Sequence, residues 1–209
     1  MVSLSKFLLI ECAAQHPLNA DGTPGEEFSR RLDRAIEIYR EYCANGWRVN
    51  IYVPGSLHQM KNKQGVYVAD PIPLCESGKN YLLSHGISEQ DILGQDANDK
   101  YKGNAGVYCS ADECYVSSKL FLNGQYQRFM VICSPAQAMR KILYYILFST
   151  MPIIYTESIQ SHYGATFHNY IYEAIKSIPN IIKSMDDMQG ENCYEAEKMR
   201  KERNPFYSS

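Results

Sequence analysis

Short apolar runs alternate with stretches of helical periodicity along most of the chain. The short runs are continuous and bounded by turn-forming residues, which predicts buried strands over residues 7–10, 47–53, 92–93, 128–133 and 152–155. Apolar residues spaced three or four apart predict helices over residues 26–45, 74–85, 108–122 and 136–148, with a terminal pair over 163–185 broken at Pro179. The polar stretches 58–70 and 95–104 are predicted loops.

This alternation predicts an α/β fold, a Rossmann-like three-layer sandwich with a mainly parallel sheet of about five strands. The 209 residues suit one such domain over residues 1–160. Residues 161–209 are expected to form a helical extension that packs on the same domain and ends in a loose, charged tail. We find no internal repeat and no linker that would divide the chain further.

Charge and cysteine content narrow the classes of function. The net charge of -2 gives no electrostatic reason to expect a nucleic acid partner. No apolar run reaches the roughly 18 residues of a membrane span. The seven cysteines are odd in number and show no metal-ligand spacing, so we expect reduced thiols in a cytoplasmic protein and no metal centre.

Candidate ligand contacts follow several predicted strands. The carboxyl ends of parallel strands meet at one edge of the sheet, where helix N-termini and backbone N–H groups favour ligand binding. Gln137 and Arg140 lie three residues apart and share a face of the helix that begins there. The ligand-binding residues expected at this edge are Glu11, Gly55, Ser56, Ser134, Gln137 and Arg140. Gly55 also fits a tight turn alone.

Several motifs occur in an order that resembles the YdcF/SanA/ElyC-like family of bacterial domains. They are Arg31 to Ala35 in the first helix, the Gly55 turn, Leu74 to Glu76, Asp112 to Cys114, and Ser134 to Arg140. The resemblance covers about residues 6 to 156. It implies the fold already described, biochemistry that is poorly defined, and an association with cell-envelope processes.

The resemblance also implies that Glu76 and Glu113 lie near the cleft as catalytic carboxylates. They would act as base and ligand orienter, or bind a divalent cation together with Asp96. The alternative, which has equal weight, is that both glutamates lie on solvated helix faces and have no role at a site.

The chain departs from the family pattern at three places, one of which is Cys114, where the family usually has asparagine. Glu11 and the residues after it replace a glycine pair, and Gln137 stands where the family often has histidine. Since Gln137 cannot transfer protons, the departures imply an altered ligand or chemistry.

Other side chains carry a structural alternative. Arg140 either binds an anion through its planar guanidinium or pairs with Glu113 or Glu157. Arg31 is expected to be a structural ion-pair partner. Cys133 is expected to be a buried thiol and not a nucleophile.

We expect the protein to bind a small anionic metabolite that contains a nucleotide, sugar or phosphate group, with turnover of that metabolite left open. The alternative is a non-catalytic regulatory or scaffold protein with an eroded site, linked to the cell envelope. Whether the chain is an enzyme, which cofactor it uses and its oligomeric state stay open. His162 and His168 are expected to be surface or packing residues.

Overall fold

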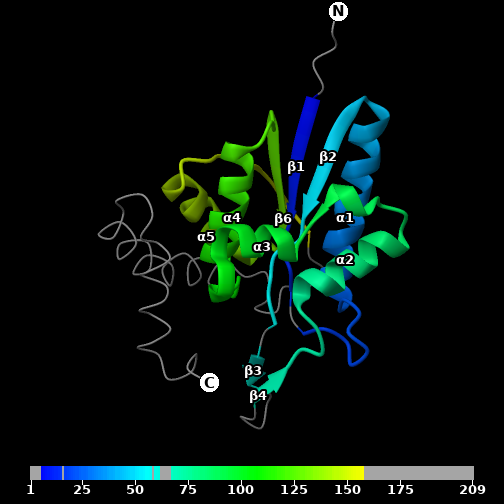
Figure 1. Cartoon of the computed structure of the whole chain (residues 1–209), viewed down its shortest axis with the longest axis vertical. Helices are drawn as coiled ribbons and strands as arrows, with labels where there is room; N and C mark the ends of the chain where they lie inside the picture. The colour runs from blue at the N-terminus through cyan, green and yellow to red at the C-terminus, as the bar shows by residue number, and fades with distance from the viewer. Residues whose placement is uncertain (1–5, 16, 58, 62–66, 158–209) are drawn as a thin grey trace, which may run out of the picture.

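Five parallel strands form the central sheet of the computed structural model, which describes residues 6–15, 17–57, 59–61 and 67–157 (Figure 1). In sheet order the strands are β5 (Ile92–Leu93), β2 (Trp47–Tyr52), β1 (Lys6–Cys12), β6 (Arg128–Cys133) and β7 (Ile153–Thr156). The helices are α1 (Glu26–Ala44), α2 (Leu74–Ser84), α3 (Gln95–Lys102), α4 (Ser110–Asn123) and α5 (Pro135–Leu147). The α/β, Rossmann-like fold is thereby confirmed, whereas the predicted helices over 163–185 lie outside the described residues.

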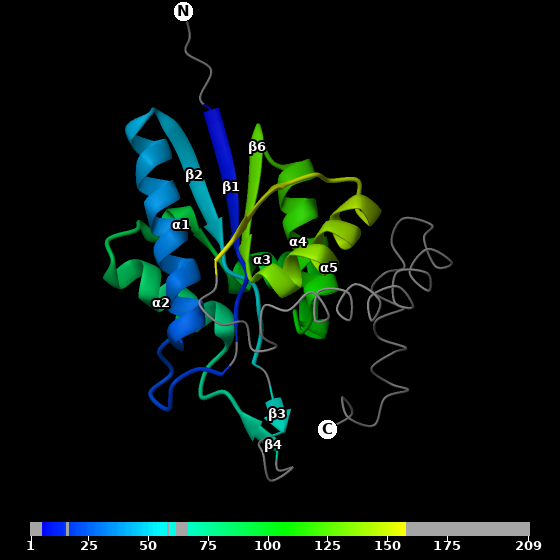
Figure 2. The same ribbon diagram turned by 180° about the vertical axis from the view of Figure 1, so that it is seen from behind.

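Two hydrophobic cores cover the two faces of this sheet. Successive strand residues point to opposite faces, so Leu8 and Ile10 of β1 join the core beneath α1 and α2, while Leu9 joins the core beneath α3, α4 and α5. Figures 1 and 2 show α1 on one side of the sheet and α4 and α5 on the other. Successive side chains of each strand therefore enter opposite cores, and both faces of the parallel sheet are buried.

Two predicted loops are in fact structured. The stretch predicted as a loop over 95–104 contains α3, which the periodicity missed because two of its inward-facing residues, Asn98 and Lys102, are polar. The stretch 58–70 contains an antiparallel hairpin of β3 (Gln59–Lys61) and β4 (Tyr67–Ala69), which projects beyond the carboxyl edge of the sheet (Figure 1). Short 3-10 helices, η1 and η2, span Glu89–Asp91 and Gly103–Ala105.

The strand order reverses at β1. The chain passes from β1 through α1 to β2 on one side, and β6 pairs with β1 on the other. The helices that follow β1 and β6 therefore cover opposite faces of the sheet. In open α/β sheets this is the point at which ligands bind, at the carboxyl ends of the strands.

No helix among the described residues is long and apolar enough to cross a bilayer. The longest described helix, α1, places charged side chains along its outer face.

Gly55 is needed for backbone geometry and for packing. Its φ is +104°, and a Cβ placed there would lie 2.9 Å from Cβ of Leu74. Its carbonyl oxygen accepts a hydrogen bond of 2.9 Å from the backbone N–H of Cys75, which ties the turn after β2 to α2. The close backbone approach that Gly55 allows is thus an approach to α2.

Gly55→Ala is expected to lower the free energy of unfolding by about 2–4 kcal/mol, because backbone strain and a clash with Leu74 add together. The matched control is Gly46→Ala, where φ is +77° and nothing lies within 4 Å of the added Cβ. The control isolates the backbone term, about 1–2 kcal/mol. Urea unfolding measures both, and equal losses would contradict the close packing at Gly55.

Candidate functional site

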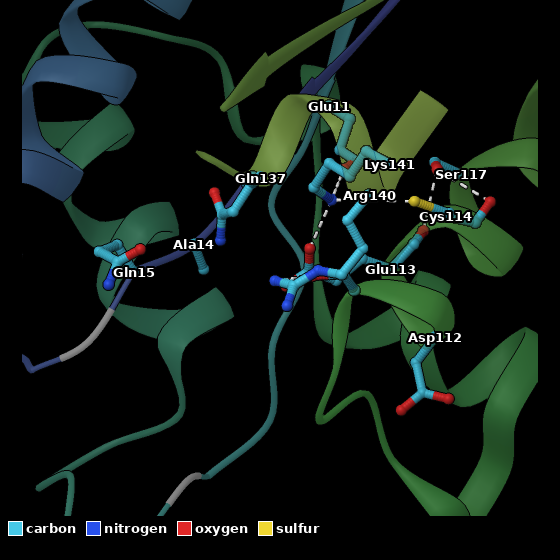
Figure 3. A network of polar contacts seen from close by, with 12 residues as sticks. Glu11, Ala14, Gln15, Asp112, Glu113, Cys114, Ser117, Gln137, Arg140 and Lys141 are labelled. Carbon is cyan, nitrogen blue, oxygen red and sulfur yellow. Dashed lines mark hydrogen bonds and ion pairs between the residues drawn. The ribbon is translucent and has the colours of Figure 1, made fainter. Parts of the chain in front are cut away.

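A buried cluster of charged and polar side chains lies beneath the carboxyl edge, between β1, α4 and α5 (Figure 3). We call Glu11, Glu113, Lys141 and Tyr145 the charge cluster. Lys141 Nζ donates hydrogen bonds to Glu11 Oε1 at 2.6 Å and to Glu113 Oε2 at 2.5 Å. The Tyr145 hydroxyl donates to the other oxygen of Glu11. The side chains of Lys141 and Glu11 are fully buried, and that of Glu113 is 11% exposed.

The local sequence explains how the charge cluster assembles. Glu11 follows the alternation of β1 and points to the same face as Leu9. Lys141 and Tyr145 are one helical turn apart on α5, so they project side by side toward that face. Glu113 stands in the first turn of α4, which packs against α5.

Electrostatics keep Lys141 charged. Burial disfavours the ammonium ion, but the carboxylates of Glu11 and Glu113 outweigh it, and they hold the pKa of Lys141 well above its ordinary value. Burial likewise raises the pKa of the Tyr145 hydroxyl. Lys141 is therefore a cation at neutral pH and cannot serve as a nucleophile or base.

Arg140 lies next to the charge cluster in sequence but is only half-buried. Its Nη2 donates a hydrogen bond of 2.8 Å to Oγ of Ser110, the first residue of α4. The same end of α4 is fixed by Asp112, which accepts 2.6 Å and 3.0 Å hydrogen bonds from Lys102 Nζ and from the backbone N–H of Tyr108. Arg140 was expected to bind an anion or to pair with Glu113 or Glu157. Glu113 accepts a hydrogen bond from Lys141, and Glu157 lies 3.6 Å from Nε of Arg34.

Ser134 and Gln137 form a capping box at the start of α5. Ser134 Oγ accepts from the backbone N–H of Gln137 at 3.3 Å, and Gln137 Oε1 accepts from the backbone N–H of Ser134 at 3.3 Å. Gln137 Oε1 also accepts from Arg31 Nη1 at 3.0 Å. Both side chains thus stabilise the junction between β6 and α5 by capping the helix, and this capping needs no ligand.

Arg31 is structural, as its sequence context predicted. It is fully buried, pairs with Glu27, and donates a 2.9 Å hydrogen bond to the carbonyl oxygen of Ala13 just after β1. It therefore fixes the end of β1 relative to α1 and, through Gln137, relative to α5.

The other predicted site residues lie apart from the charge cluster. Glu76 is exposed in the first turn of α2, and Asp96 is exposed on α3. Ser56 is bound to the loop before α4, since its N–H donates to the Val107 carbonyl at 2.9 Å and its Oγ accepts from the Val107 N–H at 3.0 Å. Among the described residues, no three His, Cys, Asp or Glu side chains gather as cation ligands would. The arrangement gives no support to the cation alternative.

Cys133 is a packing residue. Its side chain is fully buried at the end of β6, and burial raises the pKa of its thiol to about 11. A thiol that stays protonated at neutral pH is a poor nucleophile, which agrees with the interpretation of this position as a buried thiol.

Sequence reasoning missed Lys141, Tyr145 and a second buried polar pair. Tyr52 at the end of β2 donates a 2.7 Å hydrogen bond to Oδ1 of Asn98, whose side chain is fully buried. Asn98 Nδ2 finds no hydrogen-bond partner within the part of the chain that the structure describes. The available signal was a lysine on the apolar inner face of the 136–148 helix and a glutamate closing an apolar strand. Because a buried charge is costly unless it is paired, a lysine and a glutamate in apolar positions are expected to pair with each other.

Comparison of the chain with family models, with curated proteins and with solved structures gave no match.

Proposed function

We propose that the protein binds a small anionic ligand at the carboxyl edge of the sheet, next to the reversal of strand order at β1. Arg140 would contact the anionic group. The observation that carries the proposal is the half-buried guanidinium of Arg140, which Ser110 holds at the first turn of α4. A guanidinium presents five N–H donors in a planar fork, a geometry that matches the oxygens of a phosphate or carboxylate. The start of α4 adds the positive end of a helix dipole.

Glu113 narrows the class of ligand. Its side chain is 11% exposed and its carboxylate is held by Lys141. A carboxylate beside an anion site repels a second bare anion but accepts hydrogen bonds from hydroxyl groups. A guanidinium and a carboxylate that both stand at the first turn of α4 therefore suit a ligand with both a phosphate and hydroxyl groups, such as a sugar phosphate or a nucleotide.

We assign binding and no reaction. Glu113 is engaged with Lys141, and Glu76 is exposed on α2. A pair of carboxylates poised for proton transfer is thus not supported by these contacts.

The alternative, a non-catalytic regulatory protein that retains the fold, has its own support. The side chains of Glu11, Ser134 and Gln137, which a ligand would have to engage, hold the fold together. The proposal extends to membership of the YdcF/SanA/ElyC-like family of bacterial domains, on the motif order alone. It also extends to a cytoplasmic location, which the free thiols of the described cysteines favour.

The test is a thermal-shift titration with AMP and glucose 6-phosphate, and with S-adenosylmethionine as an adenosyl ligand that lacks a phosphate group. A ligand at about 100 times its Kd is expected to stabilise the protein by about 2.7 kcal/mol. Arg140→Ala is expected to weaken that binding at least about tenfold, because a charge-assisted hydrogen bond contributes about 1.5–3 kcal/mol.

The matched control is Arg48→Ala, at the amino end of β2, where the guanidinium stacks on Phe7 at the opposite edge of the sheet. It should leave binding unchanged. A shift that survives Arg140→Ala rules out the anion contact. Failure of all three ligands, together with a stable protein partner in pull-down, would favour the regulatory alternative.

A further inference from the structure

The outer side of α5 is apolar along its length. Met139 is 45% and Ile146 is 56% exposed. They lie seven residues apart and therefore share one stripe of the helix, and the partly exposed Ile142 and Leu143 fill the turn between them. We call these four residues the α5 outer face.

The inner side of α5 is already covered by the rest of the domain. Ala138, Tyr144 and Tyr145 are buried in the core beneath the helix, and Lys141 is buried within the charge cluster. A helix at the surface of a domain normally carries polar residues on its outward side, but the polar residues of α5, Gln137, Arg140 and Lys141, all lie off the α5 outer face. The composition of α5 therefore indicates that another element covers the α5 outer face.

The chain itself continues from a point next to α5. The backbone N–H of Glu157, just after β7, donates a 2.9 Å hydrogen bond to the carbonyl oxygen of Cys133. The next residue after Cys133 is Ser134, the N-cap of α5. The 52 residues that follow Glu157 thus start beside the first turn of α5. Since α5 has 13 residues, the outer face is only about 20 Å long and within easy reach.

The sequence of this continuation matches the face. Apolar residues recur three and four apart, with polar residues such as His168, Asn169, Glu173 and Lys176 between them. The apolar set is Phe167, Tyr170, Ile171, Ala174, Ile175 and Ile178. Such a stripe needs an apolar partner of about the same length.

We propose that residues 167–178 of the same chain pack their apolar stripe against the α5 outer face. This intramolecular contact buries two stripes that would otherwise both face water. It does not depend on the proposed ligand site, because none of the four residues of the α5 outer face contacts the ligand in that proposal.

The test places one charge on the α5 outer face of the full-length protein. Ile146→Asp is expected to lower the melting temperature by at least about 5 °C, because it would bury an unpaired carboxylate. The matched control is Leu122→Asp near the end of α4, where the side chain is 54% exposed, close to the 56% of Ile146. The control should change the melting temperature by no more than about 2 °C.

Ile171→Asp supplies the reciprocal test. If the two stripes pack together, the double variant Ile146→Asp/Ile171→Asp loses little more than the worse single variant, because the contact can be lost only once. Equal small effects of Ile146→Asp and Leu122→Asp would overturn the proposal. So would additive losses in the double variant, or a loss that depends on protein concentration, which would indicate a second copy on this face.

Thiol accessibility gives a second readout if Ile146→Asp does not fold. Ile146→Cys is expected to react with a maleimide at least about tenfold more slowly than Leu122→Cys, measured on the corresponding peptides by mass spectrometry. Equal reaction rates at the two cysteines would contradict the proposal that residues 167–178 cover the α5 outer face.

Discussion

Lys141→Met is expected to lower the free energy of unfolding by about 3–5 kcal/mol, which makes it the most damaging single substitution proposed for this protein. The methionine fills a similar volume but leaves Glu11 and Glu113 without the cation that both contact. Glu11 is fully buried, so its charge would lose its compensation in a medium that solvates it poorly. Urea unfolding followed by circular dichroism measures the loss.

The surface pair Lys79–Glu89 is the matched control, because its 2.6 Å separation equals that of Lys141 and Glu11 while both side chains are exposed. Lys79→Met should cost no more than about 1 kcal/mol. The variant Glu11→Gln/Lys141→Met/Glu113→Gln, which removes all three charges, should recover part of the stability lost in Lys141→Met. A cost below about 1 kcal/mol for Lys141→Met would show that the cluster does not hold these carboxylates.

The second large effect is a loss of stability in alkaline solution, which we expect to begin near pH 8.5, the ordinary thiol pKa. Burial is the main cause that raises the pKa of four thiols: to about 11 for Cys75 and Cys133, and above the ordinary value for Cys12 and Cys114. A raised folded-state pKa means that the folded protein keeps protons that the unfolded chain releases. The stability from each thiol is therefore complete below the unfolded-state pKa and is lost as the pH rises toward the folded-state pKa.

The size of the alkaline effect follows from the slope. Each buried thiol should lower the free energy of unfolding by about 1.4 kcal/mol per pH unit above about pH 8.5, which amounts to about 2 kcal/mol per thiol by pH 10. The raised pKa values of Lys141 and Tyr145 act in the same direction at still higher pH. Urea unfolding under reducing conditions at several pH values measures the slope.

Cys133→Ala should make that slope shallower by about 1.4 kcal/mol per pH unit, whatever it does to the stability at pH 7. Cys43→Ala is the comparison, because this thiol is exposed on α1 and should change the slope less. A stability that is flat between pH 8.5 and 10 would contradict the burial of the four thiols.

Most of the sheet could be predicted because its residues are apolar at nearly every position. The boundaries of β6 at Arg128–Cys133 and of β5 at Ile92–Leu93 agree with the predicted runs. The helix α3 was missed for the opposite reason, since Asn98 and Lys102 point inward to the polar partners Tyr52 and Asp112. Hydrophobic periodicity cannot detect a helix whose buried side carries such residues.

The candidate site was predicted only in outline. Gln137 was expected to contact a ligand, but its amide oxygen accepts from Arg31, which lies 106 residues earlier in the chain. Lys141 was not predicted as a site residue, although it binds both Glu11 of β1 and Glu113 of α4. Such contacts depend on the tertiary arrangement of distant segments, which the spacing of residues along the chain does not determine.

The most direct test of the account is an NMR titration of ¹⁵N-labelled protein with AMP, read at the backbone amides. We predict saturable shifts at Ser110, Glu113 and Arg140, which surround the proposed anion contact, with no shift at Arg48 on the opposite edge of the sheet. Arg140→Ala should move the midpoint of the shifts at Ser110 and Glu113 to an AMP concentration at least about tenfold higher. Saturable shifts confined to other parts of the protein, or shifts at Ser110 that saturate at the same AMP concentration in Arg140→Ala, would contradict anion binding by Arg140 at the carboxyl edge.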